Sequence, residues 1–330
     1  MTLSTPVRPA HPDDYAAAAR VLTLAQPDDP ISTTDLAQLM QDQARWGHHF
    51  GCLLLREGDQ PVGAAVFSQQ AGMYHPQRFV ARLGVHPQHQ RRGLGRELWA
   101  ALTGQLGKLG ALSVRLTARE NHPDAPGFLE RRGGVADHWF FTGTLALEDF
   151  QAEPHLATLR RCEAEGIRLV SLARLREEDW PDLNRRLCAL MNEVRLDVPR
   201  SEPATPLTQE VFDDAVLGDF GLIPEAYVVA ERGGELLGQT ALFTNGESED
   251  LFTGLTGVVR AVRGQGVATA LKVQSLLVAR EWGARRVITD NASTNAAMLA
   301  INDRLGFVRD PATASYLVPL AGDDDLPPRA

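Results

Sequence analysis

Two short glycine-bearing segments combine residue types and spacing that could do chemistry. Residues 90–95, the first loop, read Gln-Arg-Arg-Gly-Leu-Gly, and residues 263–268, the second loop, read Arg-Gly-Gln-Gly-Val-Ala. Each follows an apolar run typical of a strand and opens a run typical of a helix. Such a loop points several backbone N–H groups in one direction, where the helix dipole adds positive potential. Glycine lets the backbone approach an anion closely, and Arg91, Arg92 and Arg263 add positive charge, so we expect a phosphate or pyrophosphate ligand.

Two other phosphate-binding patterns do not fit these loops. A dinucleotide-binding fold requires Gly-x-Gly-x-x-Gly with an acidic residue about 20 positions later. A nucleotide triphosphatase loop requires Gly-Lys-Ser or Gly-Lys-Thr. Neither loop contains either arrangement. A plain turn into a helix would explain one loop alone, but it explains two loops poorly once their surroundings are compared.

The surroundings of the two loops repeat at a constant separation. Three landmarks of the first copy have counterparts 173 residues later: Val85 and Val258, Gly93 and Gly266, Gly133 and Gly306. Upstream, residues 61–67 resemble residues 236–243. A fixed offset across several elements indicates an internal duplication, which must be recognised before any fold is assigned.

Hydrophobic periodicity gives each copy the same order of elements. In the first copy we expect strands at 50–55, 62–68, 79–85, 112–117 and 139–147, and a helix at 95–109. In the second copy we expect strands at 227–231, 238–243, 251–259, 286–290 and 316–320, and helices at 267–282 and 295–305. Hairpins followed by a β-α-β-α run predict an α/β protein of the α+β type, with a mixed sheet in each copy.

The repeat suggests a division of the chain into two domains. We expect an N-terminal domain at 1–147, a linker helix within 148–166, a C-terminal domain at 167–321 and a disordered acidic tail at 322–330. The second domain has a longer front part than the first. It contains a strand at 167–172, a helix at 180–192 and a proline-bearing loop at 195–207.

Composition excludes several classes of function. The 330 residues carry a net charge of −9, which argues against a non-specific nucleic-acid binder. Three cysteines, Cys52, Cys162 and Cys188, are too few and too scattered for a disulfide framework or a zinc site, so we expect buried free thiols and no metal. No apolar run is long enough to span a membrane and no secretory signal is visible, so we expect a cytoplasmic protein. We expect the protein to be either a monomer with two paired domains or a homodimer.

The loops and the segments after them resemble a known family. Gln90-x-x-Gly93-x-Gly95 and Arg263-x-x-Gly266-x-Ala268 are similar to the acetyl-CoA pyrophosphate loop of the GNAT N-acetyltransferase superfamily. The segment from Asn295 to Phe307 resembles the helix that follows in that family, and Val7-Arg8-Pro9-Ala10 resembles its opening strand. The likeness covers nearly the whole chain as a tandem pair, as in two-domain bacterial acetyltransferases.

The resemblance implies acetyl-CoA, or another short acyl-CoA, as cofactor. Backbone amides of residues 91–95 and 264–268 would hold its pyrophosphate. Pantetheine would lie where the strand before the loop parts from the next strand, and N–H groups near Val85 and Val258 would polarise the thioester carbonyl. The implied cofactor residues are Val85, Gln90, Arg91, Arg92, Gly93, Leu94, Gly95, Val258, Val259, Arg263, Gly264, Gln265, Gly266, Val267, Ala268 and Asn295.

Acyl transfer to an amine also needs an acid and a base. Many family members carry an acid tyrosine seven residues after the helix asparagine, but here that position is Asn302, and Leu129 in the first copy. Asn302 is a candidate to hydrogen-bond the cofactor sulfur or amide. Family members often place a basic glutamate on the strand before the loop, for which the second copy offers Glu249 and Asp250.

Several alternatives remain open at this stage. Tyr316 and Asp290 are reserve candidates for the base, and a water-mediated route is a further option. The first copy has no acid in the corresponding region, so we expect direct transfer to a primary amine of a small molecule or peptide in the second copy. A bifunctional enzyme and a non-catalytic acyl-CoA sensor are the other readings. The proline-bearing loop at 195–207 would cover the acceptor site, with Asn192, Glu193 and Asp197 helping to select the acceptor, or it would brace the two domains.

Overall fold

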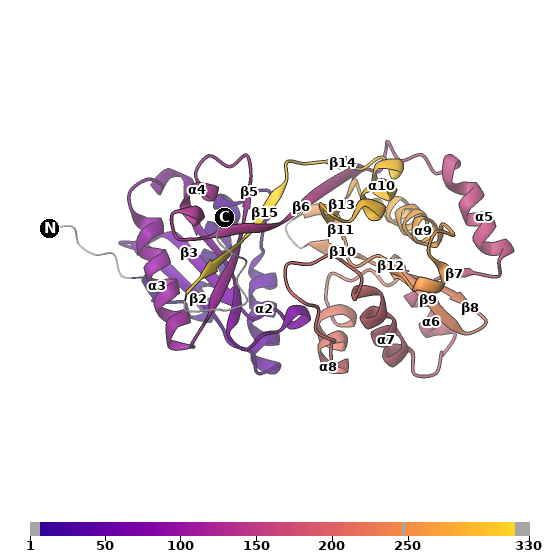
Figure 1. The fold of residues 1–330 in the computed structure, drawn as a ribbon, viewed down its shortest axis with the longest axis horizontal. Helices are drawn as coiled ribbons and strands as arrows, with labels where there is room; N and C mark the ends of the chain where they lie inside the picture. Colours follow the sequence, from indigo (N-terminus) through magenta and orange to yellow (C-terminus); the bar gives the residue numbers. More distant parts are fainter. Residues whose placement is uncertain (1–6, 246–247, 321–330) are drawn as a thin grey trace. The chain divides into compact units, whose positions relative to one another are not determined.

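The computed structural model describes residues 7–245 and 248–320, and it divides the chain into two compact units. The first unit comprises the residues up to His138 together with those from Ala314 onward, and the second comprises Trp139–Thr313. Each unit is a layered arrangement of helices on a sheet (Figure 1). No helix among the described residues is long and apolar enough to cross a lipid bilayer.

A mixed sheet forms the centre of the first unit. Its successive antiparallel neighbours are β1 (Val7–Pro9), β2 (Phe50–Glu57), β3 (Gln60–Ser68) and β4 (Arg78–Val85). β4 then pairs in parallel with β5 (Ser113–Arg119), and β5 is followed in the strand order by β15 (Thr313–Pro319). These strands lie within two or three residues of the expected ones, with the turn at Gly58-Asp59 between β2 and β3.

Helices cover both faces of this sheet. α1 (Tyr15–Ala25) and α2 (Thr33–Arg45) bury their apolar residues against alternate residues of β2 and β3 such as Leu54 and Ala64. α3 (Leu94–Lys108) covers the other face, because a side chain on Gly63 would point at Leu98. Leu98, Leu102 and Leu106 of α3 are fully buried, as their spacing of four residues predicts. α1 and α2 were not expected from the sequence.

The second unit contains two sheets, because its central strands break. β11 (Ser248–Thr253) pairs with β10 (Leu242–Asn245) and with β13 (Arg286–Ala292), which in turn pairs with residues 140–146 of β6 (Val135–Ala146). The remaining strands form a four-stranded sheet in the order β12 (Gly257–Val258), β9 (Glu235–Thr240), β8 (Val228–Arg232) and β7 (Arg168–Ser171). The single strands expected at 238–243 and 251–259 are therefore each divided in two.

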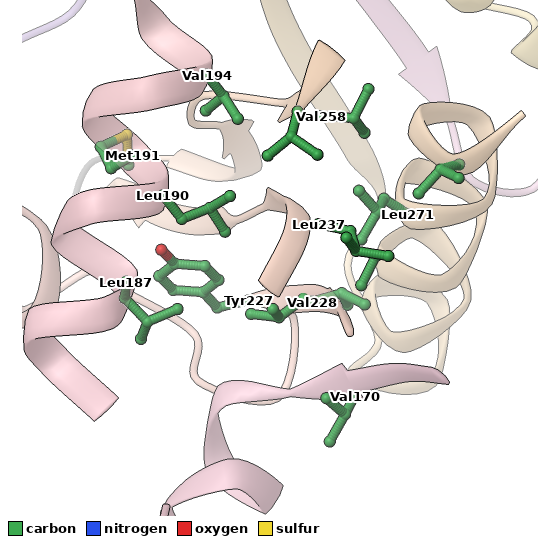
Figure 2. Close-up of a cluster of buried hydrophobic side chains, with 14 of the residues drawn as sticks. Val170, Leu187, Leu190, Met191, Val194, Tyr227, Val228, Leu237, Val258 and Leu271 are labelled. Atoms are coloured by element: carbon green, nitrogen blue, oxygen red, sulfur yellow. The ribbon is translucent and has the colours of Figure 1, made fainter. Parts of the chain in front are cut away.

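Two long helices sandwich the four-stranded sheet. α7 (Leu183–Arg195) and α9 (Val267–Glu281) approach its opposite faces, and Figure 2 shows side chains of α7 such as Leu190 opposite Leu271 of α9 across the strands. A side chain on Gly257 would collide with Val194 of α7, and one on Gly238 would collide with Val258 and lie 3.1 Å from Leu271 of α9. Close backbone approach explains both glycines.

Short helices complete the second unit. They are α5 (Leu156–Ala164), which is the expected linker helix and packs on α9, α6 (Leu172–Glu177), α8 (Gln209–Phe212) and α10 (Ala296–Leu305). α7 begins three residues later than expected, and neither α6 nor α8 was anticipated. In the first unit α4 (Ala125–Glu130) occupies the position of α10.

The structure confirms the internal duplication residue by residue. α9 and β13 have the same bounds as α3 and β5 after a shift of 173 residues. Gly110 and Gly283 end the two helices in the left-handed region, at φ 67° and 87°. Gly133 and Gly306 do the same after α4 and α10, at 78° and 93°.

The compact units differ from the two repeated copies in the last strand of each copy. The domains expected from the sequence place residues 139–147 in the first domain and 316–320 in the second. The compact units instead group Trp139 onward with the second copy and Ala314 onward with the first. The expected linker helix also belongs to the second unit. The tail at 322–330 lies outside the described residues.

Candidate active site

Both loops adopt the same unusual backbone conformation. Arg91 and Gly93 have φ of 60° and 88°, and their counterparts Gly264 and Gly266 have φ of 75° and 87°. Left-handed residues that alternate with right-handed or extended ones turn successive N–H groups to one side, which is the geometry of an anion-binding nest. Among the described residues, none of the amides of 91–95 or 264–268 donates to a turn or loop carbonyl. Within the described part of the chain, these amides therefore remain available to a ligand.

The residue that opens each loop caps the strand before it. Gln90 donates from Nε2 to the carbonyl oxygen of Val85 at 3.1 Å. Arg263 donates from Nε and Nη2 to the carbonyl oxygen of Val258, each at 3.3 Å. The two pairs are related by the 173-residue offset, so different side chains perform one structural task. This role of the first loop position was not anticipated.

The strand before each loop parts from its parallel neighbour. β4 pairs with β5 only at Arg78–Val80, and β11 pairs with β13 only at Leu251 and Phe252. Beyond these points Val85 and Val258 lie on strand ends with an antiparallel partner on one side. The N–H groups of His86 and Val259 point to that partner, at 2.9 Å from its carbonyls.

Alternation along the strand therefore turns the N–H groups of Val85 and Val258 the opposite way. They face the side where the strands have diverged. That these amides meet a carbonyl oxygen of the cofactor stays a prediction.

Charged side chains surround the second loop from two further elements. Arg161 of α5 donates from Nη2 to the carbonyl oxygen of Gln265 at 2.7 Å. A side chain on Gly266 would collide with Arg161 and Thr158. α5 therefore places a cation beside the expected pyrophosphate position, and the positive φ of Gly266 favours glycine there. The repeat could not reveal Arg161, because the first copy has no counterpart of α5 before its own strands.

The proline-bearing segment at 195–207 contacts the second loop through the carboxylate of Asp197. Asp197 accepts from Arg263 Nη2 at 2.6 Å, and from Arg260 Nε at 3.0 Å and Nη2 at 2.5 Å. These two guanidinium groups lower the pKa of Asp197. Asn192 fixes the other end of the segment, exchanging hydrogen bonds of 2.8 and 3.0 Å with the backbone of Leu207. Asn192 and Asp197 thus hold the segment, and their role in acceptor selection stays a prediction.

The arginines of the first loop are bound to carboxylates of their own unit. Arg92 lies 2.8 Å from Glu57, and Arg91 lies 3.1 Å from Asp124. All four side chains are a quarter or more exposed, so these pairs are weak by the usual measure of surface ion pairs.

α10 carries two asparagines in different roles. Asn295 precedes the helix and accepts from the N–H of Met298 at 3.3 Å, so it is an N-cap. Asn302 is 4% exposed, and its Oδ1 has no hydrogen-bond partner among the described residues. A buried carbonyl without a donor is destabilising by about 1–3 kcal/mol. An external donor is therefore expected at Asn302.

A buried lysine lies on α9, about one helical turn beyond the second loop. Lys272 is 3% exposed, and its Nζ has no hydrogen-bond partner within the described chain. Its contact is with the ring of Phe307, 5.0 Å from Nζ to the centroid. Burial lowers the pKa of this amine to about 7. Lys272 was not among the residues expected from the sequence, although lysine occurs only twice in the chain, at 108 and 272.

The first copy fills the same region with other side chains. Trp99 and Leu129 stand where the second copy has Lys272 and Asn302. Arg132 stacks on Phe128 at 3.4 Å and lies 5.6 Å from the Trp99 ring. The two copies therefore share the loop. They differ in the side chains of the two helices that follow it, which are α3 and α4 in the first copy and α9 and α10 in the second.

The structure separates the expected bases. Asp250 is buried and forms a bidentate pair with Arg286, at 2.8 and 2.7 Å. Glu249 has an 81% exposed side chain, 3.6 Å from Arg285. Both acids lie at the start of β11, whereas the loop follows the end of β12. The reserve candidate Asp290 is exposed on β13.

Tyr316 was expected in the second domain, and the compact units contradict this placement. It lies on β15 in the first unit, where burial and Glu130 of α4 raise its pKa. The strand exchange is the physical reason, since it moves the last strand of the chain to the first unit.

Comparison with known proteins identifies the class to which this site belongs. The family model described as acetyltransferase (GNAT) family matches residues 18–134 and 173–307. The chain belongs to this family, with one family domain in each copy. It is 29% identical over 320 residues to the mycothiol acetyltransferase of Thermobispora bispora, a match that covers 94% of this chain and 97% of that protein. The mycothiol acetyltransferase of a Parafrankia species is 27% identical over 302 residues, which cover 82% and 84%.

Solved structures have the same tandem fold. A GCN5-related N-acetyltransferase from Sphaerobacter thermophilus aligns with a TM-score of 0.70 at 18% identity, over 97% of both chains. A tandem GNAT protein from the clavulanic acid biosynthesis pathway aligns with a TM-score of 0.70 at 19% identity, over 97% of this chain and 99% of that one. These likenesses confirm the predicted fold class. With the family match, they make the protein an acyl-CoA-dependent N-acetyltransferase, which sets the sensor reading aside.

Proposed function

We propose that the second copy transfers an acetyl group from acetyl-CoA to a primary amine of a small molecule. The observation that supports it is the buried, unpartnered Oδ1 of Asn302 behind a loop of available amides. The first copy has the loop but carries Leu129 at the equivalent position. The names of the relatives make the amine acetylated by mycothiol acetyltransferases one candidate acceptor.

The residues of the second copy would divide the work as follows. Amides of residues 264–268 hold the pyrophosphate, with Arg161 beside them. The N–H of Val258 faces the side where the strands diverge and can donate to a carbonyl oxygen. Bound acetyl-CoA supplies an activated acyl group and a thiolate leaving group. The acceptor nitrogen forms the new bond to the acyl carbon as the carbon–sulfur bond breaks, and the released proton goes to a base.

We keep Glu249 and Asp250 as the candidates for this base. Asp250 is buried, and both of its carboxylate oxygens accept hydrogen bonds from Arg286. Glu249 has only a long contact to Arg285 and is the better candidate.

A matched pair of loop variants tests the assignment to the second copy. Arg91→Asp and Gly264→Asp place a carboxylate at equivalent left-handed positions, which aspartate tolerates better than most residues. A side chain on Gly264 meets nothing within 4 Å, so folding should be preserved. With acetyl-CoA and a panel of primary amines, we expect Gly264→Asp to lower kcat/KM at least tenfold and Arg91→Asp to leave it within about twofold. The reverse pattern would move the activity to the first copy.

A further inference from the structure

The segment after α7 carries two arginines in an unusual setting. Arg195 is the last residue of α7 and is 6% exposed, and Arg200 is a partly buried residue five positions later. Nε of Arg200 is buried without a hydrogen-bond partner, and this side chain forms no ion pair within the described chain. Arginine keeps its charge in proteins and is almost never buried unless it is paired, so Arg200 calls for an explanation.

The backbone of the segment brings the two guanidinium groups into one cluster. The N–H of Val198 donates to the carbonyl oxygen of Arg195 at 3.3 Å, which turns the chain at the end of α7. Nη1 of Arg195 then donates to the carbonyl oxygen of Thr205 at 2.7 Å. The segment therefore forms a loop closed by the Arg195 side chain, and Arg200 lies in the middle of this loop.

The charges of this cluster are of one sign. Burial lowers the pKa of Arg195 to about 10, and the nearby charge of Arg200 lowers it further. The pKa of Arg200 is itself lowered by burial. By contrast, Asp197 of the same segment neutralises Arg260 and Arg263. An acidic chain of net charge −9 thus places two cations side by side and leaves one of them without a negative partner.

The residues on either side of Arg195 connect it to the strand beside the second loop. Val194 packs against β12, and Figure 2 shows its side chain facing Val258. Asp197 binds Arg263, which caps the carbonyl oxygen of Val258. Arg195 therefore lies near the strand end whose amide is predicted to meet the acyl carbonyl.

The face of the sheet decides which reactant the two arginines would meet. α7 and α9 approach opposite faces of the four-stranded sheet. The second loop opens α9, so the phosphates of acetyl-CoA would lie with the helix on the other face. A cation cluster at the end of α7 is therefore expected to meet the acceptor.

We propose that Arg195 and Arg200 bind an anionic oxygen group, a carboxylate or a phosphate, on the acceptor. The second copy would then acetylate a primary amine that carries such a group elsewhere in the molecule. Guanidinium groups suit this task, because their planar N–H donors match the oxygens of carboxylates and phosphates. The assignment rests on the proposed function, since it names the class of acceptor used by the second copy.

A purely structural role accounts for Arg195 but not for Arg200. The bond from Arg195 to Thr205 holds the segment, whereas Arg200 holds nothing among the described residues. Arg200→Gln should therefore leave the free energy of unfolding of the apoprotein unchanged or raise it, as urea unfolding would show. A structural arginine would instead lower the stability when it is replaced.

Steady-state kinetics with matched pairs of amines tests the acceptor class. One pair is 4-aminobutyrate and 4-aminobutanamide, and the other is O-phosphoethanolamine and ethanolamine. We expect the parent protein to have a higher kcat/KM for the anionic member of a pair. Arg200→Gln should lower this preference about 10- to 150-fold, mostly through KM, because a hydrogen bond to a charged group is lost.

Two further variants identify the charge as the cause. Arg200→Lys should restore part of the preference, since it returns a cation to the cluster. Arg185→Gln, the matched control, removes the same charge from α7 at an exposed position ten residues before Arg195, or about 15 Å along the helix. It should keep the preference of the parent protein.

Calorimetry on the protein saturated with CoA supplies a readout without turnover. CoA occupies the loop and carries no acetyl group, so an added amine binds without reacting. The parent protein should bind the anionic amine more tightly than its neutral partner, and inorganic phosphate should compete with it. Arg200→Gln should lose both effects and bind CoA itself as the parent protein does.

The outcomes separate this assignment from the proposed function. If Gly264→Asp abolishes transfer but Arg200→Gln keeps the preference of the parent, or the parent has none, the acceptor assignment is wrong and the proposed function stands. If Arg200→Gln instead weakens binding of CoA, the two arginines hold a phosphate of the cofactor, which also overturns the assignment. If Gly264→Asp leaves transfer intact, the proposed function falls.

Discussion

Asp197 binds Arg263, the residue that opens the second loop, at 2.6 Å from its Nη2. The same carboxylate also binds Arg260, and Arg263 in turn caps the carbonyl of Val258. The segment after α7 is therefore attached to the second loop through the carboxylate of Asp197. Because a pyrophosphate would bring negative charge to the same arginines, we predict that Asp197 and the cofactor compete for them.

Asp197→Asn should strengthen cofactor binding and weaken acceptor binding. Removing the carboxylate frees two arginines for the pyrophosphate and eliminates a like charge near it. Exposed ion pairs contribute about 0.2–1 kcal/mol, so we expect affinity for acetyl-CoA to rise about 1.5- to 5-fold by calorimetry. The segment after α7 loses its attachment, so KM for the acceptor should rise.

Asp182→Asn is the matched control for this prediction. It makes the same charge change just before α7, whereas Asp197 lies just after that helix, and its partner is Arg185 in an exposed pair at 2.5 Å. We expect no change in either constant. Weaker binding of acetyl-CoA to Asp197→Asn would contradict the competition between carboxylate and cofactor.

The two candidate bases should give different phenotypes. Glu249→Gln should lower kcat about 10²-fold or more while the free energy of unfolding stays unchanged, because the side chain is 81% exposed. An unchanged kcat would remove Glu249 from the mechanism. Steady-state kinetics with varied amine makes the comparison.

Asp250→Asn should act on stability. It breaks the bidentate pair with Arg286 at the common start of β11 and β13, where a charged hydrogen-bonded pair contributes about 1–3 kcal/mol. Urea unfolding should show this loss. A variant of normal stability with no activity would instead assign the base to Asp250.

Lys272 should make the stability of the apoprotein rise with pH. Its folded pKa is about 7, below the ordinary 10.5 of the unfolded chain. Between these values the unfolded state holds a proton that the folded state has released, so unfolding takes up a proton and becomes less favourable as pH rises. Burial is the only cause of the shift.

The comparison with Lys272→Met isolates this contribution. The variant should unfold with a higher free energy than the parent at pH 7, and the difference should shrink steadily toward pH 10. Urea unfolding of both proteins across this range measures it. If the difference in unfolding free energy between the two proteins did not change with pH, the pKa of Lys272 would not be lowered by burial.

Much of the fold was predictable because the sequence contains an internal duplication. The offset between Gly93 and Gly266 fixed the loops, and the apolar periodicity of residues 95–109 fixed α3 and, by the repeat, α9. The loop positions needed no side-chain detail, since backbone amides and left-handed glycines are local properties.

The features that the sequence did not reveal are relationships between distant segments. The break of residues 251–259 into β11 and β12 depends on which neighbour each half pairs with. Arg161 reaches Gln265 from a helix 104 residues away, and Tyr316 belongs with the first copy because the last strand is exchanged. Lys272 lies among apolar residues of α9, and periodicity alone does not distinguish a buried lysine from one that reaches solvent.

Calorimetric titration with CoA tests the central claim most directly. The parent protein and the variants Arg91→Asp and Gly264→Asp would be compared under one set of conditions. We predict that the binding linked to activity persists in Arg91→Asp and disappears in Gly264→Asp, because the available amides of the second loop hold the pyrophosphate. Undiminished CoA binding and acetyl transfer in a folded Gly264→Asp protein would contradict this account.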